Sequence, residues 1–236
     1  MKYTWATRSD VGQVRQQNED SVLPSAGGDG TGAHLVAAIA DGMGGAAGGE
    51  IASATAIATV AAVSGEVAIR IEAANLAVVE AALQRPRLKG MGTTMTMGIF
   101  HEDGHLQIGH VGDSRGYLLR AGLLTQVTTD HSFVNEMLAS GRMTEAEAEV
   151  HPYRSVLTRV VGLEPGVEVE VLNLDLEAGD RILMCSDGIT AMIDDAAIQG
   201  ALADGADPGA AADALIAAAN AAGGVDNISA VVVDAG

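Results

Sequence analysis

The chain has 236 residues, 48% of them hydrophobic, which is enough to bury a sizeable core in one large domain or two small ones. A net charge of −18, with 13 Lys and Arg that form no run, excludes nucleic acid and anionic membranes as expected partners. The apolar runs are too short for a membrane span or a signal peptide, and the single cysteine, Cys185, excludes an internal disulfide framework. We therefore expect a cytoplasmic protein with Cys185 as a core residue.

The first part of the chain predicts two strands followed by a pair of helices. Residues 2–7 alternate apolar and polar side chains, and residues 34–40 form the continuous apolar run of a strand that is covered on both faces. A Gly-rich loop over residues 24–34 separates these strands. Residues 46–84 predict two Ala-rich helices that divide near Ser64-Gly65.

The middle of the chain predicts short strands joined by tight turns, over residues 93–100, 105–111, 115–120 and 122–127. The turn signals Asp103-Gly104 and Ala121-Gly122 favour antiparallel pairing, because parallel strands need a long crossover. Residues 129–164 predict helices and loops, with a capping box at "TEAE" over residues 144–147.

The last part predicts strands over residues 167–174, 180–186 and 227–234. Before the final strand, Asp207-Pro208 opens a helix that runs to about Asn220 and ends at Gly223-Gly224. Strand runs on both sides of helical pairs predict an α+β fold, a β-sandwich of two antiparallel sheets with a helical layer on each side (α-β-β-α). We expect one domain over residues 1–236.

Four aspartates stand where a predicted strand meets a turn: Asp41, Asp113, Asp187 and Asp226. Any one of them alone is typical of a turn or a helix cap. Four in equivalent places indicate that carboxylates converge, and converging carboxylates repel one another unless a cation compensates. An oxygen-only ligand set selects Mg²⁺, Mn²⁺ or Ca²⁺ over Zn²⁺.

The turn after Asp41 also allows another interpretation. Residues 42–47, "GMGGAA", fit the G-x-G-x-x-A pattern of a dinucleotide-binding oxidoreductase. However, Asp41 would face the pyrophosphate, and the hairpin-rich strand order is wrong for a parallel sheet. A second charged group, Arg15 with Glu19 and Asp20 in "RQQNED", is a solvated cluster on its own and a candidate phosphate clamp beside a metal.

Seven words now occur in a recognisable order: "RQQNED" (15–20), "ADGMGG" (40–45), "GMGTT" (90–94), "VGDSRGYLLR" (111–120), "DHSFV" (130–134), "CSDGI" (185–189) and "GVDNIS" (224–229). In this order the chain resembles the metal-dependent Ser/Thr protein phosphatases of type 2C (the PPM class), in particular their bacterial single-domain members. The resemblance spans nearly the whole chain and implies the same four-layer sandwich, with the variable segment 129–164 as the flap of that family.

The resemblance implies two to three Mn²⁺ or Mg²⁺ ions and a role for each matching residue. Asp41 would bridge two ions, with Asp187 and Asp226 completing one of them. Glu19 and the carbonyl of Gly42 would serve the other, with Asp20 supporting Glu19 from behind. A third ion would use Asp113 with Asp187 and Ser155, and Arg15 would hold the phosphate.

The implied reaction is hydrolysis of phosphoserine and phosphothreonine in phosphorylated proteins by a monomeric enzyme. A metal-bridging hydroxide attacks phosphorus in line, with Asp41 and Arg15 as the catalytic residues. Eukaryotic relatives carry a histidine as proton donor where this chain has Met43, which cannot donate a proton. A metal-bound water, His131 or His151 remain as donors, although both histidines are expected to be exposed residues near the flap. A regulatory module that binds metal or phosphoprotein without turnover is the competing hypothesis.

Overall fold

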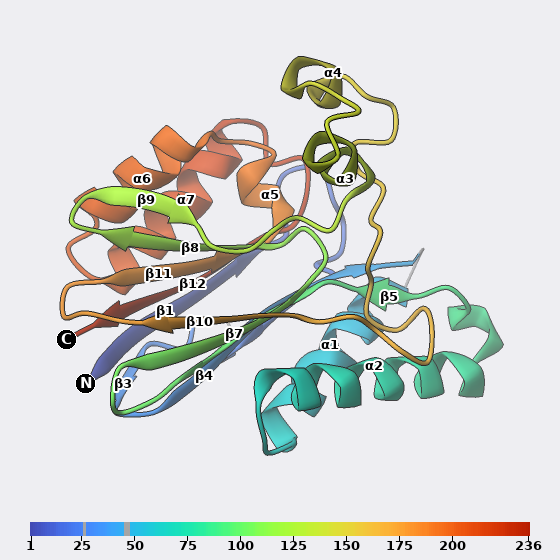
Figure 1. Cartoon of the computed structure of the whole chain (residues 1–236), viewed down its shortest axis with the longest axis horizontal. Coiled ribbons are helices and arrows are strands. Elements are labelled where there is room, and N and C mark those ends of the chain that lie inside the picture. Colours follow the sequence, from blue (N-terminus) through green and yellow to red (C-terminus); the bar gives the residue numbers. More distant parts are fainter. Residues whose placement is uncertain (26, 45–47) are drawn as a thin grey trace.

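Two antiparallel sheets stack face to face in the computed structural model, which describes residues 1–25, 27–44 and 48–236 (Figure 1). The first sheet has the order β3 (Gly30–Gly32), β1 (Tyr3–Asp10), β12 (Ile228–Ala235), β11 (Arg181–Cys185), β8 (Arg115–Arg120) and β9 (Leu123–Gln126). The second has the order β10 (Glu170–Asp175), β7 (His105–Val111), β6 (Met95–Phe100), β4 (Leu35–Met43) and β2 (Asp20–Leu23), with β5 (Gly92–Thr93) paired to the end of β4.

Helices cover both outer faces of the sandwich. The pair α1 (Gly48–Ala62) and α2 (Val67–Gln84) packs on the second sheet, and a short 3₁₀ turn (Pro86–Leu88) follows it. The pair α6 (Asp195–Asp204) and α7 (Pro208–Ala221) packs on the first sheet, and the single turn α5 (Asp187–Thr190) precedes it. The expected four-layer α-β-β-α sandwich is therefore confirmed.

Strand β4 shows why its sequence is apolar without alternation. Ala37 and Ile39 belong to the core between the two sheets, whereas Ala38 and Ala40 belong to the core between the second sheet and its helices. Successive side chains of a strand point to opposite faces, so a strand in a middle layer is apolar at every position. Cys185 is fully buried in the third core, between the first sheet and its helices, as expected.

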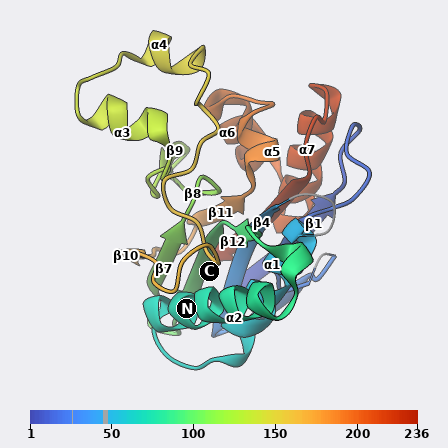
Figure 2. The same ribbon diagram turned by 90° about the vertical axis from the view of Figure 1, so that its right-hand side faces the viewer.

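The flap stands apart from the sandwich as a small lobe that carries α3 (Phe133–Ala139) and α4 (Glu145–Glu149) (Figures 1 and 2). The expected capping box is present, because the backbone N–H of Thr144 donates to Oε2 of Glu147 at 2.9 Å. The return arm of the flap is tied to its outgoing arm by a bridge between Ser132 and Leu157, and to the end of β5 by a bridge between Thr93 and Val161.

Several element boundaries differ from the sequence expectations. The strands β2 and β3 and the helices α5 and α6 were not predicted, and β10 begins at Glu170 rather than at residue 167. The two helices predicted over residues 46–84 are present from Gly48, while the start of that range and the end of the "GMGGAA" turn lie outside the described residues.

The strand pairing contradicts the dinucleotide-binding interpretation. Every pairing recorded between strands of residues 1–25, 27–44 and 48–236 is antiparallel, whereas that fold needs parallel strands with crossover helices. Strand β4 also continues through Gly42 and Met43, which pair with β5. In the same described ranges, no helix combines the length and apolar character that crossing a membrane requires.

Candidate metal centre

A pocket of about 970 Å³ opens where the two sheets meet, at the end of β4 and β11. All eight residues predicted to bind metal or phosphate line it: Arg15, Glu19, Asp41, Gly42, Asp113, Ser155, Asp187 and Asp226. Met43 also lines it, whereas Asp20, His131 and His151 do not. The convergence that the four aspartates predicted therefore exists, although their chain positions differ by up to 185 residues (226 − 41).

Asp41 is held by two threonines at the end of β5, Thr93 in the strand and Thr94 directly after it. Its backbone N–H donates to Oγ1 of Thr94 at 2.9 Å, and its carbonyl accepts from Oγ1 of Thr93 at 2.8 Å and from the N–H of Thr94 at 2.9 Å. Both threonines are buried. With the backbone fixed on two sides, the carboxylate of Asp41 is the part of the residue left to face the pocket.

Gly42 lies at a close approach of three chain segments. Its N–H donates to the carbonyl of Glu19 at 3.1 Å, and the same carbonyl accepts from Oγ of Ser53 at 2.6 Å. A Cβ on Gly42 would lie 2.1 Å from the carbonyl oxygen of Gly49 in α1, so this position admits only glycine. The pocket wall at Gly42 is therefore backbone, with Glu19 directly beside it.

Asn227 links the other two acidic segments, and sequence reasoning missed its role. Its Oδ1 accepts from the N–H of Glu19 at 2.8 Å, and its own N–H donates to Oδ1 of Asp226 at 2.8 Å. A Cβ on Gly188 would lie 1.9 Å from the carbonyl of Asn227, so α5 and the start of β12 pack backbone to backbone. Gly188 lies in the motif "CSDGI" and Asn227 in the motif "GVDNIS", and it is the pairing of β11 with β12 that brings the two motifs together.

Asp20 lies behind the pocket rather than in it. It stands opposite Asp41 in the register of β2 and β4, and its Oδ2 accepts from Oγ of Ser186 at 2.8 Å. Ser186 also accepts from the N–H of Ser229 at 3.0 Å, so the serine spans from one sheet to the other. The supporting role expected for Asp20 stays a prediction, and its side chain lies behind the pocket wall.

The carboxyl groups hold their protons more tightly than they would in water, because they are buried together. Burial raises the pKa of Asp41 well above its usual range, and the charges of Asp20 and Asp187 add to it. Burial, and then the charge of Asp187, raise the pKa of Asp113 to about 7. Burial raises the pKa of Asp20 to about 7 as well, and burial and Asp226 raise the pKa of Asp187. Without a bound cation, keeping these carboxylates ionised in the pocket therefore costs free energy.

Divalent cations fit this arrangement. Oδ1 of Asp187 and Oδ1 of Asp20 are buried and have no hydrogen-bond partner among the described residues. Buried acceptors normally have a hydrogen-bond partner, so a bound cation or its water would supply the partner that these two oxygens lack. The pocket offers carboxylate and carbonyl oxygens, the donors that Mg²⁺ and Mn²⁺ prefer.

Arg15 brings the positive charge of the pocket. Its Nη2 lies 2.7 Å from Oδ2 of Asp226, and half of its side chain is exposed. Contact with Asp226 raises the pKa of the guanidinium, which is charged at every physiological pH. A planar cation at the mouth of an acidic pocket can bind an oxyanion while the carboxylates cannot.

The expectation that His131 is an exposed residue is wrong. Only 6% of His131 is exposed, and its Nδ1 accepts from the N–H of Gly112 at 3.1 Å. Burial lowers the pKa of His131 to about 4, which leaves the ring neutral at pH 7. His151 is partly buried beside Phe133 and Tyr153 in the flap. Because neither ring lines the pocket, neither is placed to protonate a leaving group there.

Comparison with known proteins adds the family. The family model for protein phosphatase 2C matches residues 13–220. The chain is 42% identical to the serine/threonine protein phosphatase PstP of Mycobacterium tuberculosis over 98% of this chain and 44% of PstP. It is 34% identical to the serine/threonine phosphatase stp of Listeria monocytogenes over 96% of this chain and 94% of that protein. The chain thus spans less than half the length of PstP.

Solved structures agree with these matches. A crystal structure of the M. tuberculosis phosphatase PstP superimposes with a TM-score of 0.89 at 40% identity, covering 99% of both chains. The PstP catalytic domain solved in complex with two manganese ions gives a TM-score of 0.86 at 38% identity, again over 99% of both chains. The family match, the identities and the shared sandwich establish that this chain belongs to the protein phosphatase 2C family.

Proposed function

We propose that this chain hydrolyses phosphoserine and phosphothreonine in proteins, with two to three Mn²⁺ or Mg²⁺ ions held in the pocket between the sheets. The observation that carries the proposal is the convergence of Glu19, Asp41, Asp187 and Asp226 beside an exposed arginine. Carboxylates alone would repel a phosphate ester. Carboxylates with bound cations attract it, and Arg15 adds a cation of the protein's own.

The pocket residues divide into groups that would hold separate ions. Asp41 would bridge two ions, with Asp187 and Asp226 on one side and Glu19 and the Gly42 carbonyl on the other. Asp113 and Ser155 would hold a third ion at the side of the pocket nearest the flap. Bound divalent ions would supply charge neutralisation and a water acidified toward neutral pH.

Arg15 would orient the ester. Its guanidinium carries several N–H donors in one plane, a shape that matches two phosphate oxygens at once. The bond to Asp226 fixes the direction of the group before a substrate enters. Binding a pre-oriented donor loses less conformational entropy than ordering a mobile one, so Arg15 would favour in-line geometry as well as affinity.

The proton for the leaving alkoxide would come from water in the pocket. Met43, which is 39% exposed at the pocket wall, has no proton to give. His131 is neutral and buried outside the pocket. The role of Asp41 in this scheme is to hold cations, and the scheme needs no acidic side chain.

The proposal is tested with a phosphothreonine peptide and p-nitrophenyl phosphate. We expect phosphate release in Mn²⁺ and none in excess EDTA, with recovery when Mn²⁺ is restored. Full activity in EDTA would contradict the metal requirement. Mn²⁺ binding without hydrolysis of any phosphopeptide would instead favour the regulatory module that binds metal without turnover.

Replacing Arg15 by Lys is expected to lower kcat/KM for the phosphothreonine peptide by about 10- to 100-fold. The lysine keeps the positive charge but replaces a two-pronged donor by a single ammonium group. Steady-state kinetics at saturating Mn²⁺ would measure the change. Arg8, which pairs with Asp29 and Asp213 away from the pocket, offers the control, and Arg8→Lys should leave kcat/KM within about two-fold. Equal losses in both variants would refute the role of Arg15.

The wider assignments belong to the same proposal. Phosphorylated substrates of Ser/Thr kinases are the expected protein partners, with the 236 residues acting as a single catalytic domain and as a monomer. A cytoplasmic location fits the one buried cysteine, since such a thiol needs no oxidising compartment. The acidic surface argues against nucleic acid or anionic membrane as a partner.

A further inference from the structure

Asp113 lies in a turn whose backbone conformation is fixed by its packing against neighbouring residues. The turn joins β7 to β8, and Gly112 adopts a φ of +109°, a conformation that favours glycine. A Cβ on Gly112 would lie 2.6 Å from Cγ2 of Thr94. Oγ1 of Thr94 lies 2.7 Å from Oγ of Ser114, with which it forms a hydrogen bond. Oγ1 of Thr94 also accepts from the N–H of Asp41. The turn is therefore packed against the segment that fixes Asp41.

His131 forms hydrogen bonds with the backbone N–H and the carbonyl of Gly112. Its backbone N–H donates to the Gly112 carbonyl at 2.7 Å, and its ring Nδ1 accepts from the Gly112 N–H at 3.1 Å. One residue thereby satisfies both polar groups of the glycine that precedes Asp113. The ring bond is the one that a substitution can remove while the backbone bond remains.

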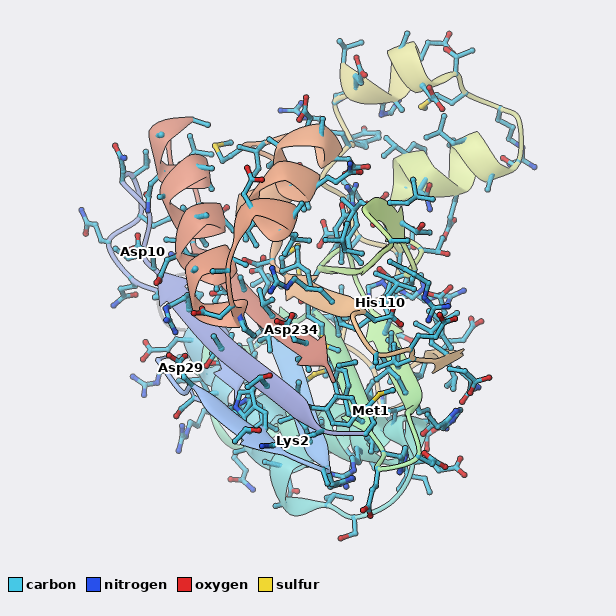
Figure 3. All side chains as sticks on the ribbon, turned by 90° about the vertical axis from the view of Figure 1, so that its left-hand side faces the viewer. Met1, Lys2, Asp10, Asp29, His110 and Asp234 are labelled. Carbon is cyan, nitrogen blue, oxygen red and sulfur yellow. The ribbon has the colours of Figure 1, made fainter. Side chains whose placement is uncertain are left out.

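The ring of His131 is itself held in place. It stacks on the ring of His110 with centroids 4.7 Å apart and planes inclined by 31°. Figure 3 shows His110 on the side of the sandwich that carries the flap helices. Nδ1 of His110 lies 2.8 Å from Oγ1 of Thr96, and its Nε2 donates to the carbonyl of Thr129 at 3.1 Å. The stack is thus a rigid support for the acceptor on His131.

These two rings and Glu170 have ligand atoms within 4.8 Å of one another, a spacing that a metal ion could use. Their hydrogen bonds argue for a different purpose. A metal on Nε2 of His131 would require a proton on Nδ1, where the Gly112 N–H already points. Oε2 of Glu170 accepts from the N–H of Thr129 at 3.1 Å. The cluster is a hydrogen-bonded support and not a second metal site.

The flap attaches to the same residue. The carbonyl of His131 accepts from the N–H of Thr158 at 2.9 Å. Because Nδ1 accepts from Gly112, the ring proton is on Nε2, so Nη1 of Arg159, 3.1 Å away, is a neighbour of the ring and not a hydrogen-bond donor to it. The return arm of the flap, which carries Ser155 and Leu157 into the pocket wall, is therefore seated on His131. The turn of Asp113 and the flap therefore meet at one residue, the first through the ring and backbone N–H of His131 and the second through its carbonyl.

We propose that His131 is a positioning residue that fixes the carboxylate of Asp113 for a divalent ion and ties that ion's affinity to the seating of the flap. The proposal rests on the proposed function, since it takes Asp113 as a metal ligand. His131 touches no reacting atom. It acts by holding the Gly112 peptide, as residues behind metal ligands commonly do, and loss of such residues weakens metal affinity by about 10- to 100-fold.

The test compares substitutions that keep or remove the acceptor at Nδ1. His131→Leu removes it, whereas the amide oxygen of His131→Asn can take the place of Nδ1. Isothermal titration calorimetry with Mn²⁺, without substrate, should show the weakest Mn²⁺ step weakened about 10-fold in His131→Leu and within about two-fold of wild type in His131→Asn. The Mn²⁺ concentration for half-maximal hydrolysis should rise by the same factor, with kcat recovered at high Mn²⁺.

Controls separate positioning from general damage. His34→Leu makes the same change at an exposed site and should leave Mn²⁺ binding unchanged. If His131→Leu does not fold, His131→Gln replaces it, because its longer amide reaches toward Nε2 and should weaken Mn²⁺ binding relative to His131→Asn. Asp113→Asn should remove the weakest Mn²⁺ step, and adding His131→Leu to it should cause no further loss.

The outcomes are distinct. Equal weakening by Leu and Asn, or an effect of His131→Leu that persists in the Asp113→Asn background, would overturn the positioning role. Unchanged Mn²⁺ binding in Asp113→Asn would overturn it too, while wild-type hydrolysis of phosphopeptide would leave the proposed function standing. An inactive wild type with Mn²⁺ bound would contradict the proposed function itself.

Discussion

Asp41→Asn is expected to lower Mn²⁺-dependent hydrolysis of a phosphothreonine peptide by at least about 10³-fold, while the metal-free variant melts at a higher temperature than wild type. The loss follows because Asp41 faces both proposed ion positions, and each bound ion contributes several kcal/mol to charge stabilisation. The stability gain follows because a neutral amide costs less to bury than a carboxylate and because it relieves repulsion with Asp20 and Asp187. Initial rates and thermal melts in EDTA measure the two effects.

A variant that loses activity by misfolding would lose stability as well. A loss of activity together with a rise in Tm therefore distinguishes the electrostatic effect from misfolding. We expect a rise in Tm of at least about 3 °C, since 1 kcal/mol corresponds to roughly 2–4 °C for a domain of this size. Asp175→Asn is the matched control: it removes the same charge from a side chain that is 99% exposed, and activity and Tm should stay as in wild type. Loss of both activity and stability in Asp41→Asn would contradict the electrostatic account.

Metal-free protein is expected to become less stable as pH rises from 6.5 to 8.0, by roughly 5 °C or more in Tm. Asp20 and Asp113 have pKa values of about 7 in the fold and near 3.9 in the unfolded chain. Between these values the folded state binds more protons than the unfolded state. The contribution of these two groups to stability is therefore greatest at low pH and is lost as pH rises through 7.

Two histidines act in the opposite direction at lower pH. The pKa values of His110 and His131 fall to about 4 because the rings are buried, so the unfolded chain takes up protons first and the contribution of these two rings to stability falls below about pH 6.5. Working above pH 6.5 keeps their contribution small. Saturating Mn²⁺ should abolish the fall in Tm at pH 8.0, because cations replace the protons. A metal-free Tm that does not change with pH would show that Asp20 and Asp113 ionise without a cost from burial or from neighbouring charges.

Sequence patterns sufficed for the sandwich because its strands carry strong local signals. Ala121-Gly122, for example, adopts the positive φ values, +51° and +79°, that a tight hairpin requires. Strand β2 was missed because it has four residues and begins with the buried charge of Asp20. Helix α6 was missed as well, although Asp194 caps it by accepting from the N–H of Ala197 at 2.8 Å.

The site was partly readable for a different reason. Aspartates at the ends of apolar strands stand out, so Asp41, Asp187 and Asp226 could be predicted as a group. Thr94 and Asn227 could not, because a buried threonine or asparagine has no sequence signature until its partners are placed. The burial of His131 likewise depends on contacts with β7 and the flap return, which lie far from it along the chain.

The pocket draws Asp41 from one sheet and Asp187 and Asp226 from the segments around β11 and β12 of the other. The spacing of its oxygens is therefore set by how the two sheets slide against each other. Side chains between the sheets, such as Met184 and Val231, act as spacers for a centre they never touch. The packing between the sheets therefore sets the size of the opening available to a cation, although none of its side chains is a ligand.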